Sequence, residues 1–356
     1  MVRQHVTIAT SLLASGAMSA ESPASVLPRP PTGFNSWARF KTNVQQSIFT
    51  GAADVMLARG LLKAGYNRIN LDDGWSTKDR ASNKSMVFDD EKFPKGPYWL
   101  TDYIKDKGFV PGIYTDAGYT SCGGYPASLG GYEQIDYDTF KTWGFEYLKM
   151  DGCNLANNTE ASYHQTYGKW YDILSSDDKQ MVFSDSTPAY FSNIANLTDW
   201  YTVMGWAEQY GELARHSADV QTFSKADNAW SSIMFNYGQH VRLARYQRPG
   251  YFNNPDYLIV DNPSLSLDEK KSHFALWATL SAPLIISANI SALSNNEIKY
   301  LTNDNFIAVN QDSLVQQATL AHRDRYWDIL SKSVSNGNRV ITVLNKQASA
   351  GNIFVS

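Results

Sequence analysis

The 356-residue chain is poor in cysteine, with only Cys122 and Cys153. Neither has histidines at zinc-ligand spacing, so a structural zinc site is excluded, and we expect neither a metal nor a cofactor. In an oxidising compartment two cysteines most simply form one disulfide, whereas two free buried thiols are the alternative.

The chain also lacks an excess of charge of one sign, since its formal net charge is −4. This balance gives no reason to expect nucleic acid or an anionic membrane as a partner. No apolar run reaches the length of a transmembrane helix, and there is no internal repeat or low-complexity tract. With 43% apolar and 19% charged residues, the composition is that of an ordinary globular protein, and it leaves the oligomeric state open.

The N-terminus has the pattern of a secretory signal peptide. Arg3 and His5 precede the apolar run 6–18, and small residues follow around Ala20 and Ala24. We therefore expect a signal peptide over residues 1–20, or up to 24, and a secreted protein. Four sequons for N-glycosylation agree with secretion, and their asparagines are Asn83, Asn157, Asn196 and Asn289.

Aromatic residues, by contrast, are abundant, with 10 Trp, 21 Tyr and 16 Phe. Most of them must belong to the core of a chain this large. Trp and Tyr also suit the binding of sugar rings, because each combines an apolar face with a polar edge.

Strand-like and helix-like segments alternate through most of the chain. Strands are expected at 32–37, 66–71, 109–114, 145–150, 181–184, 200–204, 250–252 and 283–287. Helices are expected at 48–63, 99–107, 137–143, 161–175, 220–237, 270–280 and 295–301. Eight such units predict an α/β fold, a (β/α)₈ TIM barrel over residues 28–312.

The pattern changes after residue 312. Two strands are expected at 326–333 and 339–345, joined by a turn at 335–338. We assign residues 313–356 to the start of a C-terminal antiparallel β-domain. A sheet this small rarely stands alone, so it either leans on the barrel or is incomplete.

The strongest candidate for chemistry is Asp151. It directly follows the strand expected at 145–150, and a (β/α)₈ barrel keeps its catalytic residues at the carboxyl ends of its strands. Lys149 lies two residues earlier, so both side chains point to the same side of the strand. A cation there would keep Asp151 ionised and able to attack an electrophile. An acid that caps a strand-to-helix turn would give the same pattern.

Acids follow two other expected strands: Asp72 and Asp73 follow the second, and Asp116 follows the third. All would face the same mouth of the barrel, where carboxylates can accept hydrogen bonds from the vicinal hydroxyls of a sugar. Turn formation by the Asp-Asp-Gly sequence is the alternative.

Arg215 and Asp219 form a further candidate pair. Their four-residue spacing suits an ion pair on the surface of a helix. The alternative is catalytic, because glycoside hydrolysis uses two carboxylates across one glycosidic bond. Asp151 and Asp219 come from different loops that a barrel can bring together.

Six ordered motifs together resemble one family. They are GFNSW at 33–37, LDDGW at 71–75, GIYTDAG at 112–118, YLKMDGCN at 147–154, RHSAD at 215–219 and NNPD at 253–256. From residue 32 to about 317 the chain resembles glycoside hydrolase family 27, the α-galactosidases and α-N-acetylgalactosaminidases. Two positions depart from that family: Gly74 replaces a cysteine of a second disulfide, and Asn254 replaces an Asp.

The resemblance implies a secreted TIM barrel with a C-terminal antiparallel β-domain and a retaining mechanism. It implies that Asp151 is the nucleophile and Asp219 the acid/base. It also implies a disulfide between Cys122 and Cys153 that brackets the pocket. The sugar-binding residues that it implies are Trp37, Asp72, Asp73, Tyr114, Lys149 and Arg215.

The loop after the fifth strand bears on the substrate. In vertebrate-type α-galactosidases this loop resembles Glu-Trp-Pro-Leu-Tyr, and its Glu and Leu crowd the 2-position of the sugar. Here Ser186 and Ala189 take those places, before Tyr190, which resembles the α-N-acetylgalactosaminidase pattern. Neutral drift in an enzyme for plain galactose is the alternative.

We therefore predict a secreted retaining exo-glycosidase that removes terminal α-galactose-type residues from saccharides or glycoconjugates. Its pocket should accept or prefer α-N-acetylgalactosamine. Other activities of the family, β-L-arabinopyranosidase or isomalto-dextranase, stay open, although the Asp72-Asp73 pair argues for a sugar with a 6-OH. A non-catalytic galactose-binding barrel would have lost one carboxylate, and both Asp151 and Asp219 are present.

Overall fold

The computed structural model describes residues 26–177, 181–192, 197–220, 229–347 and 351. The expected signal peptide and the sequon residue Asn196 lie outside these residues.

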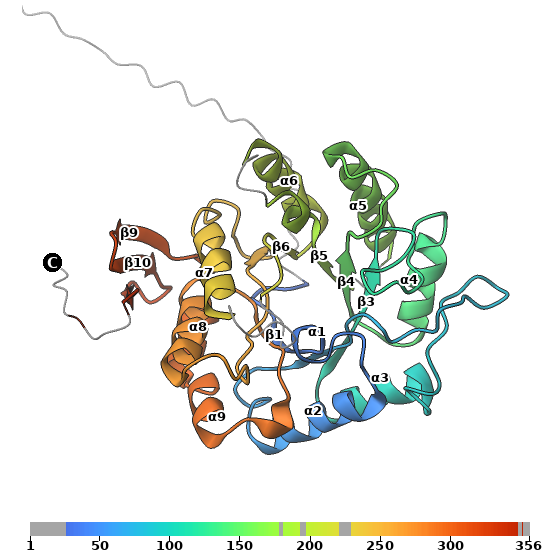
Figure 1. Ribbon diagram of the computed structural model, residues 1–356, viewed down its shortest axis with the longest axis horizontal. Coiled ribbons are helices and arrows are strands. Elements are labelled where there is room, and N and C mark those ends of the chain that lie inside the picture. The colour runs from blue at the N-terminus through green and yellow to red at the C-terminus, as the bar shows by residue number, and fades with distance from the viewer. Residues whose placement is uncertain (1–25, 178–180, 193–196, 221–228, 348–350, 352–356) are drawn as a thin grey trace, which may run out of the picture.

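The described residues form eight parallel strands in one curled sheet, and the TIM-barrel prediction is confirmed (Figure 1). The strand order is β7-β6-β5-β4-β3-β2-β1-β8. A parallel bridge between Leu258, just after β7, and Ile286 of β8 joins the two ends of the sheet. The strands are β1 (Thr32–Asn35), β2 (Arg68–Asn70), β3 (Val110–Asp116), β4 (Tyr147–Asp151), β5 (Val182–Asp185), β6 (Leu213–Arg215), β7 (Phe252–Asn254) and β8 (Leu284–Ile286).

Helices surround the strands and cover their outer face (Figure 1). Apolar residues at helical spacing face inward from them and build a large core with the strands. A second, smaller cluster contains strand residues such as Tyr147, Leu213 and Phe252. The helices are α1 (Trp37–Phe40), α2 (Gln46–Ala58), α3 (Gly96–Asp106), α4 (Glu133–Thr142), α5 (Glu160–Ser175), α6 (Leu197–Tyr210), α7 (Ala229–His240), α8 (Leu267–Thr279), α9 (Asn295–Leu301) and α10 (Asp304–Asn310). Short 3₁₀ turns, η2 (Thr187–Phe191) and η4 (Ile290–Ala292), follow β5 and β8.

The sixth strand expected at 200–204 is wrong. These residues lie inside α6, and the strand is β6. The aromatic and β-branched residues of the segment favoured a strand, but buried residues recur at helical spacing over the longer segment: Trp200, Val203, Met204 and Ala207. The three residues of β6 are too few to show a period of their own.

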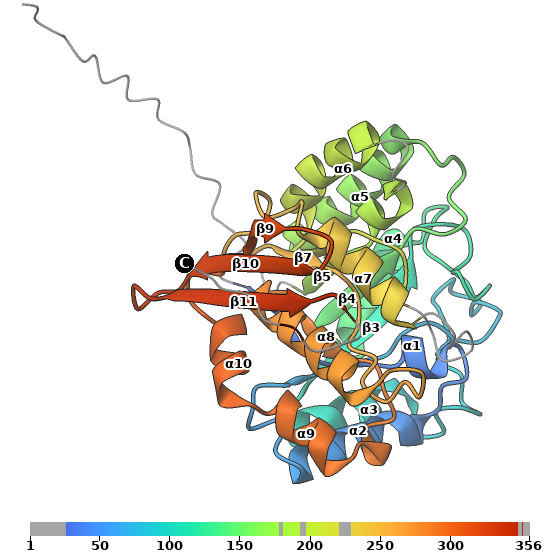
Figure 2. The same cartoon turned by 60° about the vertical axis from the view of Figure 1, so that its left-hand side comes forward.

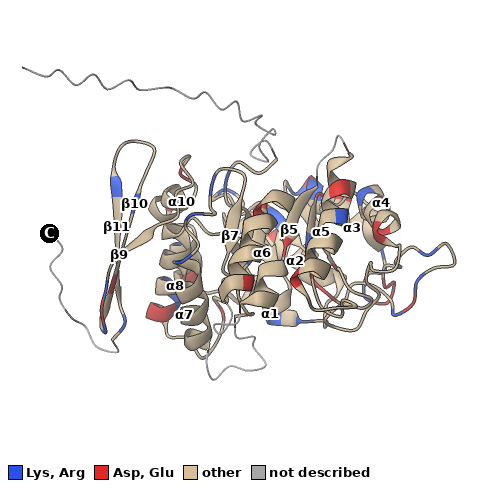
Figure 3. Ribbon diagram, turned by 90° about the horizontal axis from the view of Figure 1, so that it is seen from above, with Lys and Arg blue, Asp and Glu red and all other residues tan. Residues whose placement is uncertain are grey.

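A separate three-stranded antiparallel sheet follows the barrel, in the order β11-β10-β9. Its strands are β9 (Thr319–Arg323), β10 (Trp327–Ser333) and β11 (Arg339–Asn345). The hairpin of β10 and β11 was expected, whereas β9 and α10 were not. Figures 2 and 3 show the sheet against one side of the barrel, next to α7, α8 and α10.

Buried polar contacts attach this sheet to the barrel. The hydroxyl of Tyr237 on α7 donates to Asp328 of β10 at 2.9 Å, and Thr279 of α8 contacts Thr342 of β11 at 2.9 Å. The sheet therefore leans on the barrel. Acidic and basic residues are scattered along the helices and strands without a block of one sign (Figure 3). Among the described residues no helix is both long and apolar enough to cross a bilayer.

Lys332 of β10 should make the stability pH-dependent. Its Nζ is buried against Ser281 Oγ (2.6 Å) and the Val309 carbonyl (2.7 Å), and burial lowers its pKa to about 8. Below pH 8 the folded protein carries the full penalty of the buried charge. Between pH 8 and the ordinary pKa of 10.5, the folded lysine is deprotonated while the unfolded one keeps its proton, so the free energy of unfolding rises with pH.

We expect the wild type to gain stability relative to Lys332→Met between pH 7 and pH 10, by up to about 3 kcal/mol. The melting temperatures of both proteins across this range measure the gain. A difference between them that does not change with pH would contradict the prediction.

Candidate active site

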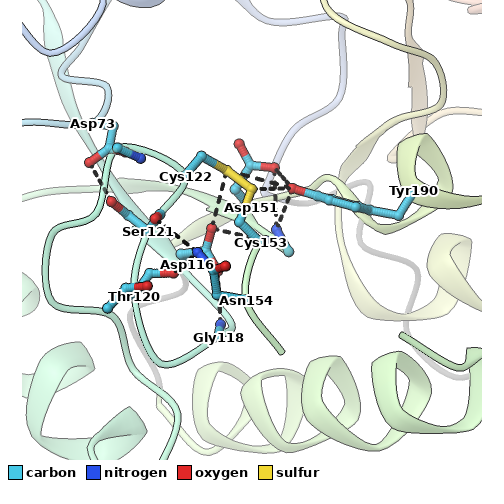
Figure 4. The surroundings of a disulfide bond; sticks show 12 residues. Asp73, Asp116, Gly118, Thr120, Ser121, Cys122, Asp151, Cys153, Asn154 and Tyr190 are labelled. Carbon is cyan, nitrogen blue, oxygen red and sulfur yellow. Dashed lines mark hydrogen bonds between the residues drawn. A yellow bond between two sulfur atoms is a disulfide. The ribbon is translucent and has the colours of Figure 1, made fainter. Parts of the chain in front are cut away.

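Asp151 ends β4 at the mouth of the barrel, where its side chain is 21% exposed. Its Oδ1 accepts a hydrogen bond from the Tyr190 hydroxyl at 2.5 Å and another from the Gly152 amide at 3.2 Å. Its Oδ2 lies 3.8 Å from Lys149 Nζ. Figure 4 shows the hydroxyl of Tyr190 next to the carboxylate of Asp151, beside the disulfide. Tyr190 therefore contacts the predicted nucleophile itself, which its sequence position did not indicate.

Lys149 lies closer to Asp72 than to Asp151. Its Nζ is 2.8 Å from Asp72 Oδ2, which also accepts from the Asn35 amide (2.8 Å) and the Tyr257 hydroxyl (3.1 Å). Burial alone would lower the pKa of Lys149, but Asp72, Tyr257 and Asp151 outweigh it, and the net pKa is raised. A buried, charged lysine thus lies between Asp72 and Asp151.

Asp73 is buried and anchors the loop that carries Cys122. Its carboxylate accepts from Ser121 Oγ (2.9 Å) and the Gly123 amide (2.7 Å), and burial raises its pKa. It also accepts from the Gly74 amide at 2.8 Å, as the turn explanation requires, and its role in sugar binding stays a prediction.

Gly74 itself has a φ of +95°, and a Cβ there would lie 2.7 Å from Thr42 Cα. This backbone has no room for the cysteine of a second disulfide.

Arg215 is the centre of a buried ion-pair network at the end of β6. Its guanidinium contacts Asp219 Oδ1 at 2.9 Å and Asp256 Oδ1 at 2.9 Å, and its side chain is 6% exposed. Because Arg215 is on a strand and deeply buried, the explanation of a surface helical pair is wrong. Asn254 accepts from the Asp256 amide at 2.9 Å, so it holds the turn that positions this partner.

Asp219 lies at the mouth, with its side chain 47% exposed. Its Oδ2 accepts from Trp37 Nε1 at 2.9 Å. Burial would raise the pKa of Asp219, but the charge of Arg215 and the hydrogen bond from Trp37 outweigh it and hold the pKa well below its usual range. The carboxylate is therefore ionised in the free protein.

One cavity of about 280 Å³ brings Asp151 and Asp219 together. Nine further residues line it: Trp37, Cys122, Cys153, Ser186, Ala189, Tyr190, Arg215, Ser217 and Ala218. Asp72, Asp73, Tyr114 and Lys149 are buried and do not line this cavity. Sequence reasoning missed Tyr257 and Asn35 as partners of Asp72, although Asn35 lies within a quoted motif.

The predicted disulfide between Cys122 and Cys153 is present. It ties the loop after β3 to the loop after β4, directly beside Asp151 (Figure 4). Beneath it, Asp116 accepts from the amides of Gly118 (2.8 Å) and Cys153 (3.1 Å). Burial and the neighbouring Asp151 raise the pKa of Asp116 well above its usual range. Asp116 and the two cysteines could face one ion, but sulfurs in a disulfide offer no thiolate.

We expect the double variant Cys122→Ser/Cys153→Ser to lose stability and activity together. The bridge spans 31 residues, a loop whose closure is worth about 3–4 kcal/mol in the unfolded state. Its loss also loosens the segment that positions Asp151, so we expect kcat to fall about tenfold. Thermal unfolding and kcat measure both effects. A reductant should lower the melting temperature and kcat of the wild type and leave those of the variant unchanged. Thiol titration confirms that the disulfide is reduced. If the reduced wild type stays fully active, the prediction is wrong.

The exposure of the sequon residues differs. Asn83 and Asn157 are exposed, and Asn289 is partly buried.

Comparisons with known proteins found a matching family model and similar relatives. A family model described as Alpha galactosidase A matches residues 29–312. Alpha-galactosidase A of Aspergillus niger is 56% identical over 332 residues, which cover 92% of this chain and 61% of the relative. The chain thus spans about three-fifths of the length of that relative.

Solved structures share the fold. Alpha-galactosidase I from Mortierella vinacea superposes with a TM-score of 0.81 at 28% identity, covering 92% of this chain and 83% of that one. The Saccharomyces cerevisiae α-galactosidase with raffinose superposes with a TM-score of 0.78 at 27% identity, covering 90% and 74%.

Proposed function

Since the chain belongs to the Alpha galactosidase A family of glycoside hydrolases, we propose that it hydrolyses terminal α-galactosides with retention of configuration. The observation that carries the proposal is the single cavity lined by both Asp151 and Asp219. Asp151 ends β4 and Asp219 follows β6, and two such carboxylates supply the nucleophile and the acid/base that this hydrolysis requires.

Asp151 is the nucleophile in this proposal, and its contacts select the attacking oxygen. Tyr190 and the Gly152 amide occupy Oδ1, whereas Oδ2 lies 3.8 Å from Lys149 Nζ and accepts no hydrogen bond from the described residues. Oδ2 is therefore free to attack the anomeric carbon and form a glycosyl-enzyme. Lys149 stabilises the charge of Asp151 before attack.

Asp219 is the acid/base, which first gives a proton to the leaving oxygen and later removes one from water. A general acid must be protonated, yet Arg215 and Trp37 favour its ionised form in the free protein. A sugar whose 2-substituent takes hydrogen bonds from Arg215 would weaken that pairing and raise the pKa of Asp219. In the second step Asp219 acts as a base, and the ionised form that Arg215 and Trp37 favour is then the form required.

The pocket also supports acceptance of α-N-acetylgalactosamine. Ser186 lines the cavity, and its buried hydroxyl has no hydrogen-bond partner among the described residues. Ala189 beside it is small. A buried hydroxyl without a partner is costly, so a ligand amide or carbonyl at this place would satisfy it.

We expect the protein to hydrolyse both p-nitrophenyl α-galactoside and p-nitrophenyl α-N-acetylgalactosaminide. In the double variant Ser186→Glu/Ala189→Leu, kcat/KM for the second substrate should fall at least about 100-fold, because the larger side chains fill the space of the acetamido group. The value for the galactoside should stay within about fivefold.

The conservative control is Ser186→Ala, which removes the hydroxyl and keeps the space. If the wild type has no activity on the N-acetylgalactosaminide, the proposal that Ser186 and Ala189 leave room for an acetamido group is wrong.

We further propose that the protein is secreted and N-glycosylated. The disulfide and the exposed asparagines Asn83 and Asn157 support this. Intact masses before and after N-glycosidase treatment test it, since unchanged masses would exclude glycosylation.

A further inference from the structure

Lys41, directly after α1, has a strained backbone. Its φ is 52° and its ψ is −136°, a combination outside the small left-handed region that residues with a side chain tolerate. Glycine adopts such angles without a steric penalty, so a lysine at this position makes the fold less stable. Strain of this kind persists only where the surrounding structure enforces it, and it often marks a functional position.

The packing of the next residue enforces this backbone. A Cβ at Gly74 would lie 2.7 Å from Thr42 Cα, and a Cβ at Gly123 would lie 2.7 Å from Thr42 Cγ2. Thr42 is therefore held between the loops that follow β2 and β3. The Lys41 amide still donates to the Trp37 carbonyl at 2.9 Å, so the chain has to leave α1 within this single residue.

The side chain of Lys41 lies on the indole of Trp37. Its Nζ is 4.4 Å from the centroid of that ring, which is a cation–π contact. Trp37 lines the catalytic cavity, and its Nε1 donates to Asp219 Oδ2 at 2.9 Å. Burial lowers the pKa of Lys41, and among the surrounding charges Asp219 opposes this most strongly. Lys41 itself does not line the cavity, so it can act on the indole but not directly on the sugar.

We propose that Lys41 is a positioning residue of the active site: its ammonium holds the indole of Trp37 in the orientation that contacts Asp219, and the strained backbone places the ammonium there. The inference rests on the proposed α-galactosidase function. Its consequence is that the residue which gives the higher activity at this position gives the lower stability.

Three variants separate the charge from the strain. Lys41→Met removes the charge and keeps the strain, Lys41→Arg keeps both, and Lys41→Gly removes both. In Lys41→Met and Lys41→Gly we expect kcat/KM for p-nitrophenyl α-galactoside to fall about 3- to 10-fold, the effect of one lost cation–π contact. In Lys41→Arg the value should stay within about twofold of the wild type. The melting temperature should rise in Lys41→Gly alone, by about 2–4 °C.

Lys84 provides the matched control. It is a second lysine with a positive φ, of 74°, but it is exposed and does not line the catalytic cavity. Lys84→Gly should also raise the melting temperature, and it should leave kcat/KM unchanged.

A double-mutant cycle tests the route through the indole. In a Trp37→Leu background Lys41→Met should lower kcat/KM no further, because the ring on which Lys41 acts is absent. A further loss in that background would overturn the proposal.

The other outcomes are equally distinct. Wild-type kcat/KM in Lys41→Met, an equal loss in Lys41→Arg, or no gain in the melting temperature of Lys41→Gly would each overturn the proposal and leave the proposed function intact. A wild type that cleaves no α-galactoside would overturn both.

Discussion

Asp151→Asn is expected to lower kcat by at least about three orders of magnitude while the fold is kept. An amide has nearly the same shape as the carboxylate and can still accept a hydrogen bond from Tyr190, so the barrel should not change. It cannot form the glycosyl-enzyme, however, because it is a poor nucleophile. A loss of three orders of magnitude corresponds to about 4 kcal/mol of transition-state stabilisation.

The identity of the nucleophile can be tested by rescue as well as by loss. Azide added to Asp151→Gly can enter the space of the lost carboxylate and attack the sugar from that side, which gives the β-galactosyl azide by a single inversion. Circular dichroism and melting temperature check the fold. Asp138→Asn, a change on the outer helix α4, is the control and should keep full activity. Unchanged hydrolysis by Asp151→Asn would refute the assignment.

Asp219→Ala is expected to have the second largest effect, and its size should depend on the leaving group. Loss of a general acid costs about 10²–10⁴-fold on substrates with a sugar leaving group, which must be protonated to depart. An aryl galactoside with an acidic phenol needs less help, so its first step should slow far less and glycosyl-enzyme should accumulate. Azide attacking this intermediate should give the α-galactosyl azide, the opposite anomer to that from the nucleophile variant.

The pH dependence of kcat/KM distinguishes an acid/base role of Asp219 from a role in sugar binding alone. The protonated acid is needed in the first step, so kcat/KM should fall as pH rises above the pKa of Asp219. Because Arg215 holds that pKa down, Arg215→Gln should raise it and move this limb to higher pH, in addition to weakening sugar binding. Equal losses of Asp219→Ala on saccharide and activated aryl substrates would contradict an acid/base role.

The barrel could be predicted from the sequence because its signals are local. The segment at 147–151 combines strand formers with a lysine and an acid on one side, and the structure has β4 there. The segment at 200–204 shows the limit of this reasoning. Its residues prefer strands individually, but α6 buries them together along one helical face, and that choice depends on packing against the rest of the barrel.

The candidate active site also has residues that the sequence indicated and residues that it did not. Asp151 was identifiable because it directly follows a strand, and the position after a strand fixes which mouth of the barrel an acid faces. The function of Arg215 was not identifiable from its spacing to Asp219, since four residues suit a helix as well as a loop. The partner that decides the matter, Asp256, lies 41 residues further along the chain.

The order of the strands and motifs in the sequence determined the barrel and the acid at the end of β4, whereas the disulfide beside it was predicted through the family resemblance. Only the tertiary structure decided which groups contact each other. It pairs Lys149 chiefly with Asp72 rather than Asp151, directs the Tyr190 hydroxyl to Asp151 and joins Trp37 to Asp219 across 182 residues. These contacts depend on how the ends of separate strands converge at one mouth of the barrel. The closure of the barrel, rather than either segment alone, therefore sets the distance between two such side chains.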